Sequence, residues 1–262
     1  MKLHVDITGE GADLVFLHGW AMHGGVFDEL LPTLAQRYRV HCVDLPGHGR
    51  SEFDTGIRSL EQLTAAVQLH VPQQAMVLGW SLGGMIALKL AQWQALRALV
   101  LVSTTPRFVA NESWPQGMAA DIFAQFFSNL HQNLIGTVDN FLRLQVRGDS
   151  HAASTFAALH ASLLQHPAHP AALQAGLEIL RDADERAALP DIRLPTLVMA
   201  GEYDRITHPN TSSYLAGHLP QARFCLIKRA GHAAFMSHRE EFLGELQRFL
   251  TDLDKREVAV SD

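Results

Sequence analysis

Short apolar runs alternate with segments of helical spacing through the first hundred residues. The apolar runs predict buried strands at 14–17, 40–45, 75–78 and 98–102. Between them, apolar residues recur every three or four positions and predict helices at 26–36, 59–70 and 82–92. Residues 3–8 alternate in polarity, and Gly9-Glu10-Gly11 predicts a hairpin-type turn into the next strand. Strands that alternate with helices predict an α/β fold, with a mostly parallel sheet and helices on both faces.

The alternation stops near residue 105 and resumes near residue 191. The segment between carries helical stretches, broken by prolines and glycines and rich in aromatic residues. Strands and helices then return as strand 196–200, helix 209–217, strand 223–227 and helix 238–250. We therefore expect one α/β core, residues 1–104 and 191–255, a helical lid at 105–190, and a frayed tail at 256–262. Helix packing alone would also explain the aromatic residues of the insertion.

Composition and charge narrow the classes of function. Apolar residues make up 47% and charged residues 18% of the 262-residue chain, and the formal net charge is −6. Such a composition is typical of a soluble globular enzyme, and the negative charge disfavours a nucleic-acid partner. We find neither an apolar stretch of about 18 residues nor a signal peptide, so a membrane partner is not expected. Cys42 and Cys225 lie in predicted strands, which indicates reduced core thiols and a cytoplasmic protein.

The stretch Gly79-Trp80-Ser81-Leu82-Gly83 has the pattern G-x-S-x-G between a predicted strand and a predicted helix. This context is that of a nucleophile elbow, in which a sharp turn lifts the serine hydroxyl above the sheet. The alternative is a glycine-rich turn with an incidental serine. A serine nucleophile also needs a base, an acid that orients it, and donors for the oxyanion.

Two later loops supply an acid and a base in the order Ser, Asp, His. Asp204 follows the predicted strand 196–200, and His232 follows the strand 223–227. Because the carboxyl ends of parallel strands share one edge, we expect Ser81, Asp204 and His232 to meet there. Glu202 is a competing acid, and any one of the 15 histidines is weak evidence by itself.

The backbone N–H groups of Trp20 and Leu82 are the expected oxyanion donors. His18 and His48 are expected to hold loops by hydrogen bonds rather than to act as bases. The sequence contains no H-E-x-x-H motif, no paired C-x-x-C and no nucleotide-binding glycine motif. His166 and His169 are flanked by prolines and do not read as a ligand pair. We therefore expect no metal site and no cofactor.

The motifs HGW, DLPGHGRS, GWSLGG, GEYD and AGHA resemble those of the α/β-hydrolase superfamily. More narrowly, nearly the whole chain resembles the pimeloyl-acyl-carrier-protein methyl ester esterases of biotin synthesis. The shared features include Ser113-Trp114-Pro115, Gly176 to Leu180 and Gly231 to Phe235. The resemblance implies a Ser81 nucleophile, a His232 base, an Asp204 orienter, an oxyanion hole at Trp20 and Leu82, and no cofactor. It also implies that the lid contacts substrate, together with His232, through Phe141, Leu142, Arg143, Leu144 and Gln145.

By the same resemblance, the partner is an acyl carrier protein that bears a pimeloyl methyl ester. Arg143 and Arg147 lie one helical turn apart and are candidates for docking it, or simply a solvated helix face. From residue 105 to 190 there are five arginines, no lysine and eight acidic residues, so the lid is not basic overall. The alternatives are a broad esterase of small-molecule esters and a ligand-binding protein of the hydrolase fold. We expect a monomer.

Overall fold

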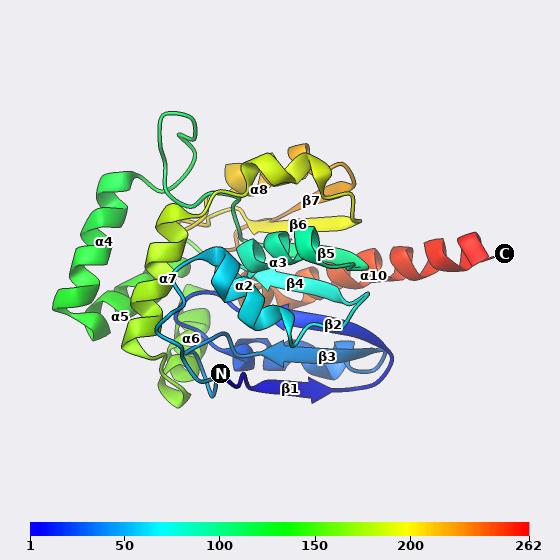
Figure 1. Cartoon of the computed structure of the whole chain (residues 1–262), viewed down its shortest axis with the longest axis horizontal. Coiled ribbons are helices and arrows are strands. Elements are labelled where there is room, and N and C mark those ends of the chain that lie inside the picture. The colour runs from blue at the N-terminus through cyan, green and yellow to red at the C-terminus, as the bar shows by residue number, and fades with distance from the viewer. Residues whose placement is uncertain (262) are drawn as a thin grey trace.

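The computed structural model describes the backbone of residues 1–261 and the side chains of residues 1–255. A seven-stranded sheet in the order β1-β3-β2-β4-β5-β6-β7 forms its centre (Figure 1). Every pair of neighbouring strands from β3 to β7 is parallel, and only β1 runs antiparallel to its neighbour. The strands are β1 Val5–Thr8, β2 Ala12–Leu17, β3 Tyr38–Val43, β4 Met76–Trp80, β5 Ala98–Val102, β6 Thr196–Gly201 and β7 Ala222–Ile227. The predicted α/β sheet is confirmed.

The hairpin predicted at Gly9-Glu10-Gly11 is wrong. The strand β1 pairs with β3, through Val5 opposite Val43 and Thr8 opposite Val40, and β3 separates it from β2. The two glycines do turn the chain, with φ of 83° and 111°. The strands before and after this turn, β1 and β2, do not pair with each other. Two strands that follow each other in sequence therefore lie on opposite sides of a third strand.

Helices cover both faces of the sheet, as the pattern predicts. In Figure 1, α2, α3 and α8 lie in front of the strands and the long helix α10 lies behind them. The helices that flank the sheet are the 3-10 helix η1 Gly24–Leu30, α1 Leu31–Leu34, α2 Leu60–Gln68, α3 Leu82–Trp93, α8 Pro209–His218, α9 Ala234–Ser237 and α10 Arg239–Ser261. The hydrophobic core lies between the sheet and the helices on its two faces, and every residue of β4 and β5 is buried there.

Four helices gather beyond the carboxyl ends of the parallel strands, at the left of Figure 1. They are α4 Ala120–Gln132, α5 Leu134–Gln145, α6 Ala152–Gln165 and α7 Pro170–Asp182, and the 3-10 helix η2 Arg186–Asp191 leads back to the sheet. They occupy the segment for which a lid is predicted. The division into core and lid stays a prediction, as does the frayed tail at 256–262, where side chains and residue 262 lie outside the described residues.

No helix in the described part of the chain is long and apolar enough to cross a membrane. Cys42 is buried and Cys225 half-buried, and both are free thiols. Burial raises the pKa of the Cys42 thiol to about 12, so this group stays protonated at neutral pH.

Candidate active site

Ser81 lies at the turn between β4 and α3 with φ of 56° and ψ of −117°. A residue with a side chain adopts such a backbone only at a cost, which is typical of functional turns. Glycines make the turn possible on both sides. A Cβ on Gly79 would lie 2.3 Å from the carbonyl oxygen of Gly83, and one on Gly83 would lie 2.2 Å from that of Leu17. The strand and the helix therefore approach each other more closely than any side chain would allow.

The backbone around Ser81 is held by neighbouring strands. Its N–H donates to the carbonyl of Val102 at 3.0 Å, and its own carbonyl accepts from the Thr104 hydroxyl at 2.7 Å. Leu82 is the first residue of α3, where backbone N–H groups have no acceptor within the helix. The serine hydroxyl thus stands at the positive end of a buried helix.

Asp204 and His232 form a hydrogen-bonded pair in the interior. Their side chains are 0% and 1% exposed, and Asp204 Oδ2 lies 2.8 Å from His232 Nδ1. The other carboxylate oxygen, Oδ1, accepts from the N–H groups of Ile206 and Thr207, at 2.8 and 2.9 Å. The Thr207 hydroxyl adds a donor to Oδ2 at 3.0 Å. Four hydrogen bonds thus fix the carboxylate, which in turn fixes the orientation of the imidazole.

The far nitrogen of the imidazole, His232 Nε2, is buried and has no hydrogen-bond partner among the described residues. Trp80, next to Ser81, ties the histidine to the elbow. Its indole N–H donates to the His232 carbonyl at 3.0 Å, and the two rings lie 5.5 Å apart. No hydrogen bond joins the Ser81 hydroxyl to His232 in the described structure. Such bonds often tighten only when a substrate is present.

Glu202, the competing acid, lies at the surface. Its carboxylate accepts from the Arg229 N–H at 2.9 Å and from Lys228 Nζ at 3.0 Å. These two donors hold the pKa of Glu202 below its usual range. The structure therefore brings Asp204, and not Glu202, into contact with the histidine.

Trp20 lies directly beside the elbow. A Cβ on Gly19 would be 3.2 Å from Ser81 Cβ, so the chain at 19–20 passes against the serine. The Trp20 indole N–H donates to the Leu173 carbonyl of α7 at 2.8 Å, and its ring meets Phe126 and Phe141 edge to face. Trp20 thus joins the sheet edge to the helices above it.

His18 and His48 hold loops, in agreement with the expectation. His18 Nδ1 donates to the Gly19 carbonyl at 2.8 Å and its Nε2 accepts from the Leu45 N–H at 2.9 Å. His48 Nδ1 donates to the Pro46 carbonyl at 3.0 Å. Burial lowers the pKa of His18 to about 3 and that of His48 to about 4, so both rings are neutral at neutral pH.

A cavity opens above Ser81, between the sheet edge and the helices α4, α5 and α7. Ser81 lies on its wall, and apart from the hydroxyl and Asn140 the lining side chains are those of large apolar residues. They are Trp20, Phe108, Met118, Ile122, Phe126, Phe141, Leu144, Leu177, Leu180 and Ile206. Asn140 and Ile122 are exposed, so the cavity reaches solvent between α4 and α5. Its lining is suited to an aliphatic chain.

Of the lid residues predicted to contact substrate, Phe141 and Leu144 line this cavity. Leu142 and Gln145 are buried and lie outside the lining, although the Gln145 carbonyl accepts the His232 N–H at 2.8 Å. Arg143 is exposed; it donates to Asp139 at 2.8 Å and stacks over the Phe156 ring. The prediction that Arg143 and Arg147 lie one turn apart on the same helix is wrong, because α5 ends at Gln145 and Arg147 lies in the turn that follows. The Arg147 side chain is exposed and has no hydrogen bond or ion pair within the described residues.

Sequence reasoning missed three aromatic or flexible residues of the cavity, namely Phe108, Met118 and Phe126. It also missed Asp149, whose Oδ2 accepts the Gly231 N–H at 2.6 Å and so supports the loop before His232. Phe126 fits the helical spacing of apolar residues, but this spacing does not show whether its side chain faces a cavity or the core. No local signal connects Asp149 with a residue 82 positions further along the chain.

The sheet, with a serine at the strained turn after β4 and four helices beyond its edge, has the fold of a hydrolase. The family model for the alpha/beta hydrolase fold matches residues 14–239. An esterase (EaEST) from Exiguobacterium antarcticum superposes with a TM-score of 0.87 at 24% identity, over 95% of each chain, which shows the shared fold.

Curated relatives narrow the class. A pimeloyl-[acyl-carrier protein] methyl ester esterase of Nitrosomonas europaea is 43% identical over 245 residues, covering 92% of this chain and 97% of the relative. One from Xanthomonas campestris pv. campestris is 41% identical over 254 residues, covering 96% and 100%. The chain therefore belongs to the alpha/beta hydrolase fold family and, within it, to the pimeloyl-[acyl-carrier protein] methyl ester esterases. It is a carboxylic ester hydrolase, as its sequence predicts.

Proposed function

We propose that the protein hydrolyses the methyl ester of a pimeloyl chain carried by acyl carrier protein, with Ser81 as nucleophile, His232 as base and Asp204 as its orienting acid. The observation that carries this proposal is the buried Asp204–His232 pair, joined at 2.8 Å beside the strained elbow of Ser81. The printed names of the relatives supply the substrate.

The proposed reaction has two halves. His232 Nε2 takes the Ser81 proton while Oγ attacks the ester carbonyl, and the N–H groups of Trp20 and Leu82 stabilise the resulting oxyanion. The C–O bond to the methoxy group then breaks, and methanol leaves with the proton held by His232. Water attacks the acyl-enzyme with His232 as base again, and Ser81 recovers its proton as the carboxylic acid departs. Neither half needs a cofactor.

The cavity supports a long aliphatic acyl group. An alkyl chain whose ester lies at Ser81 would pass Phe141 and Leu144 and emerge near Asn140, between α4 and α5. A carrier attached to the far end of the chain would then meet the outer face of α5, which bears Arg143, and the turn after it, which bears Arg147. We infer that Arg147 contributes more to docking, because the Arg143 guanidinium already contacts Asp139 and Phe156.

A second candidate is a short-chain carboxylesterase without a dedicated carrier partner. The occupied Arg143 and the excess of acidic residues in the lid favour it. The two functions share the same nucleophile and differ only in what reaches the cavity mouth.

The decisive experiment offers purified protein three substrates: a p-nitrophenyl ester, free dimethyl pimelate and pimeloyl-acyl carrier protein methyl ester. We expect mass spectrometry to show demethylation of the carrier-bound ester, with kcat/KM far above that for free dimethyl pimelate. The Ser81→Ala variant, checked for folding by circular dichroism, should hydrolyse none of them. Activity on small esters alone would favour the second candidate, and activity in Ser81→Ala would refute the assigned nucleophile.

Rescue of biotin auxotrophy tests the same proposal in cells. A strain that lacks its own esterase should grow without biotin when it expresses this chain, and should not grow with Ser81→Ala. Failure of the wild-type chain, expressed and folded, would argue for the second candidate.

A further inference from the structure

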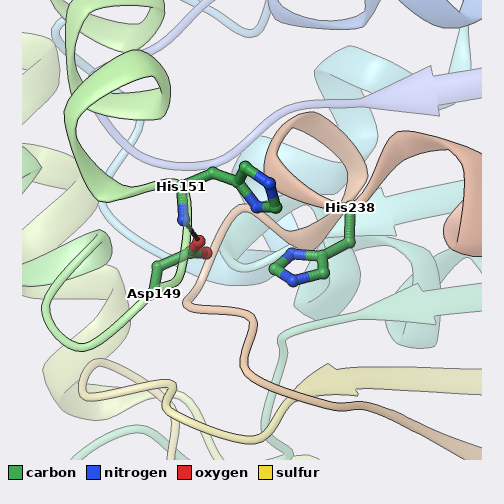
Figure 2. Close-up of side chains that lie close together, drawn as sticks. All are labelled: Asp149, His151 and His238. Atoms are coloured by element: carbon green, nitrogen blue, oxygen red, sulfur yellow. Dashed lines mark hydrogen bonds between the residues drawn. The ribbon is translucent and has the colours of Figure 1, made fainter.

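A cluster of two imidazoles and a carboxylate lies at the junction of the lid and the carboxyl-terminal helices. Asp149 and His151 come from the turn between α5 and α6, and His238 comes from the turn between α9 and α10 (Figure 2). One potential ligand atom from each residue lies within 4.8 Å of those of the other two. Asp149 is buried, His238 is half-buried and His151 is exposed, so the cluster is open to solvent on one side.

The two imidazoles already converge on a single point. His151 Nδ1 and His238 Nε2 lie 3.2 and 3.1 Å from the same oxygen, the Ser150 hydroxyl. Their rings meet nearly at right angles with centroids 5.0 Å apart. Two nitrogens directed at one small group are disposed to bind one ion in its place.

A neighbouring hydroxyl contacts the other ring nitrogen of His238. The Ser237 Oγ lies 2.8 Å from His238 Nδ1, which leaves Nε2 as the ligand atom. Hydrogen bonding at the second ring nitrogen is the usual way in which proteins orient a metal-binding histidine. The hollow beside the cluster is lined by Glu29, Glu240 and Glu241 with only Arg239 opposing them, so the local charge favours a cation.

The donor set selects among metals. Two imidazoles with one carboxylate suit Zn²⁺ and its transition-metal neighbours, whereas Mg²⁺ and Ca²⁺ prefer oxygen ligands. Zinc binds histidine nitrogen at about 2.0–2.1 Å and accepts water in the remaining position. The three donor atoms lie within 4.8 Å of one another, so a single ion could contact all three after the side chains adjust.

The same turn supports the catalytic histidine. Asp149 Oδ2 accepts the Gly231 N–H at 2.6 Å, and the Ser150 N–H donates to the Arg229 carbonyl at 3.0 Å. Both contacts fall within three residues before His232. An ion that draws the Asp149 carboxylate towards the imidazoles would weaken its bond to Gly231 and displace the His232 loop.

We propose that Asp149, His151 and His238 bind Zn²⁺, and that the bound ion slows ester hydrolysis by disturbing the loop that carries His232. The zinc site goes beyond the proposed function, although the test of its effect on ester hydrolysis rests on that function. Binding is measured independently of turnover, so a failure of the proposed esterase activity would leave the binding result intact.

The test uses untagged, full-length, metal-free protein and isothermal titration with ZnCl₂. We expect one site that is absent with MgCl₂ and weakened at least about tenfold in His151→Ala and in His238→Ala, since loss of a ligand's support alone costs about 10–100-fold in affinity. His218→Ala is the matched control, because His218 is an exposed histidine of α8 and should leave binding unchanged. Wild-type affinity in both His151→Ala and His238→Ala would refute the site.

The coupling is tested with p-nitrophenyl butyrate at zinc concentrations that saturate the site. Zinc should lower kcat of the wild-type and His218→Ala enzymes and have little effect on KM. The His151→Ala and His238→Ala enzymes should keep their metal-free activity in zinc. Inhibition that persists in these two variants would mean that zinc acts elsewhere, for example at His232 itself. Binding without any change in kcat would likewise refute the coupling.

Discussion

The Asp204 carboxylate meets His232 with one oxygen and the backbone with the other. Oδ2 lies 2.8 Å from Nδ1 of the imidazole, while Oδ1 accepts the N–H groups of Ile206 and Thr207. The carboxylate is therefore anchored independently of the histidine it orients. Because the pair is almost wholly buried, little solvent is available to replace either partner.

Asp204→Asn should reduce kcat on a p-nitrophenyl ester by roughly 10⁴-fold, because an amide stabilises the wrong tautomer of the neighbouring histidine. Glu202→Gln is the matched control: it lies two residues away, bonds to Lys228 and Arg229, and should keep nearly full activity. Steady-state kinetics on both variants would show which of the two acids supports catalysis. The opposite ranking would mean that Glu202 is the functional acid.

Charge reversal at Arg143 and Arg147 should slow demethylation of the carrier-bound ester at least about tenfold and leave p-nitrophenyl ester hydrolysis nearly unchanged. The reason is that rim charges act on encounter with a charged partner rather than on chemistry. Arg147→Glu alone should produce most of the effect, since Arg143 is engaged by Asp139. Arg193→Glu, a variant outside the lid helices, is the control. Equal slowing of both substrates would remove these arginines from docking.

Gly79→Ala should destabilise the protein by about 1–3 kcal/mol, because the new methyl would lie 2.3 Å from the Gly83 carbonyl oxygen and force the strand away from the helix. Gly217→Ala is the control, since a Cβ at Gly217 meets nothing within 4 Å. Alanine in that helix should stabilise by roughly 0.5–1 kcal/mol. Urea unfolding of both variants measures the difference. A Gly79→Ala protein as stable as wild type would contradict the close packing of β4 and α3.

Buried His18 and His48 should make the protein lose stability in mild acid. Burial lowers their folded pKa values to about 3 and about 4, whereas an unfolded histidine titrates near about 6.5. Their contribution is thus fully present above about pH 6.5 and is lost as the pH falls towards these folded values. Each contributes up to about 1.4 kcal/mol per pH unit across its window.

Urea unfolding between pH 7.5 and pH 4.5 tests this dependence, with His48→Gln as the comparison. The substitution should reduce the acid slope of the unfolding free energy by up to about 1.4 kcal/mol per pH unit. His70→Gln, which alters a histidine outside the core, should leave the slope unchanged. An unaltered slope in His48→Gln would show that folding does not lower the pKa of His48.

The sheet and its reactive edge follow from local signals. Ser81, Asp204 and His232 each come directly after an apolar run, and parallel strands deliver such positions to a common edge. The antiparallel pairing of β1 could not be predicted in this way, because Gly9 and Gly11 allow both a hairpin and a longer turn. Which strand β1 joins depends on β3, about thirty residues later.

The walls of the cavity and the histidine cluster were beyond local reasoning for a different reason. Phe108, Phe126 and Leu180 share the apolar character of core residues, and only the packing of α4, α5 and α7 directs them to a cavity. His151 and His238 are 87 positions apart and meet where the turn before α6 packs against the turn after α9. His238 has no neighbour in sequence that marks it as a ligand.

Trp20 connects the edge of the sheet with the helix α7. Its backbone passes beside Ser81, while its indole bonds to the Leu173 carbonyl and a Cβ on Gly176 would lie 2.7 Å from its ring. The Trp20 side chain therefore fixes the position of α7 relative to the sheet. A helix transplanted from another hydrolase in place of α7 would have to bring a carbonyl and a glycine to the same two places to keep the contact with Trp20.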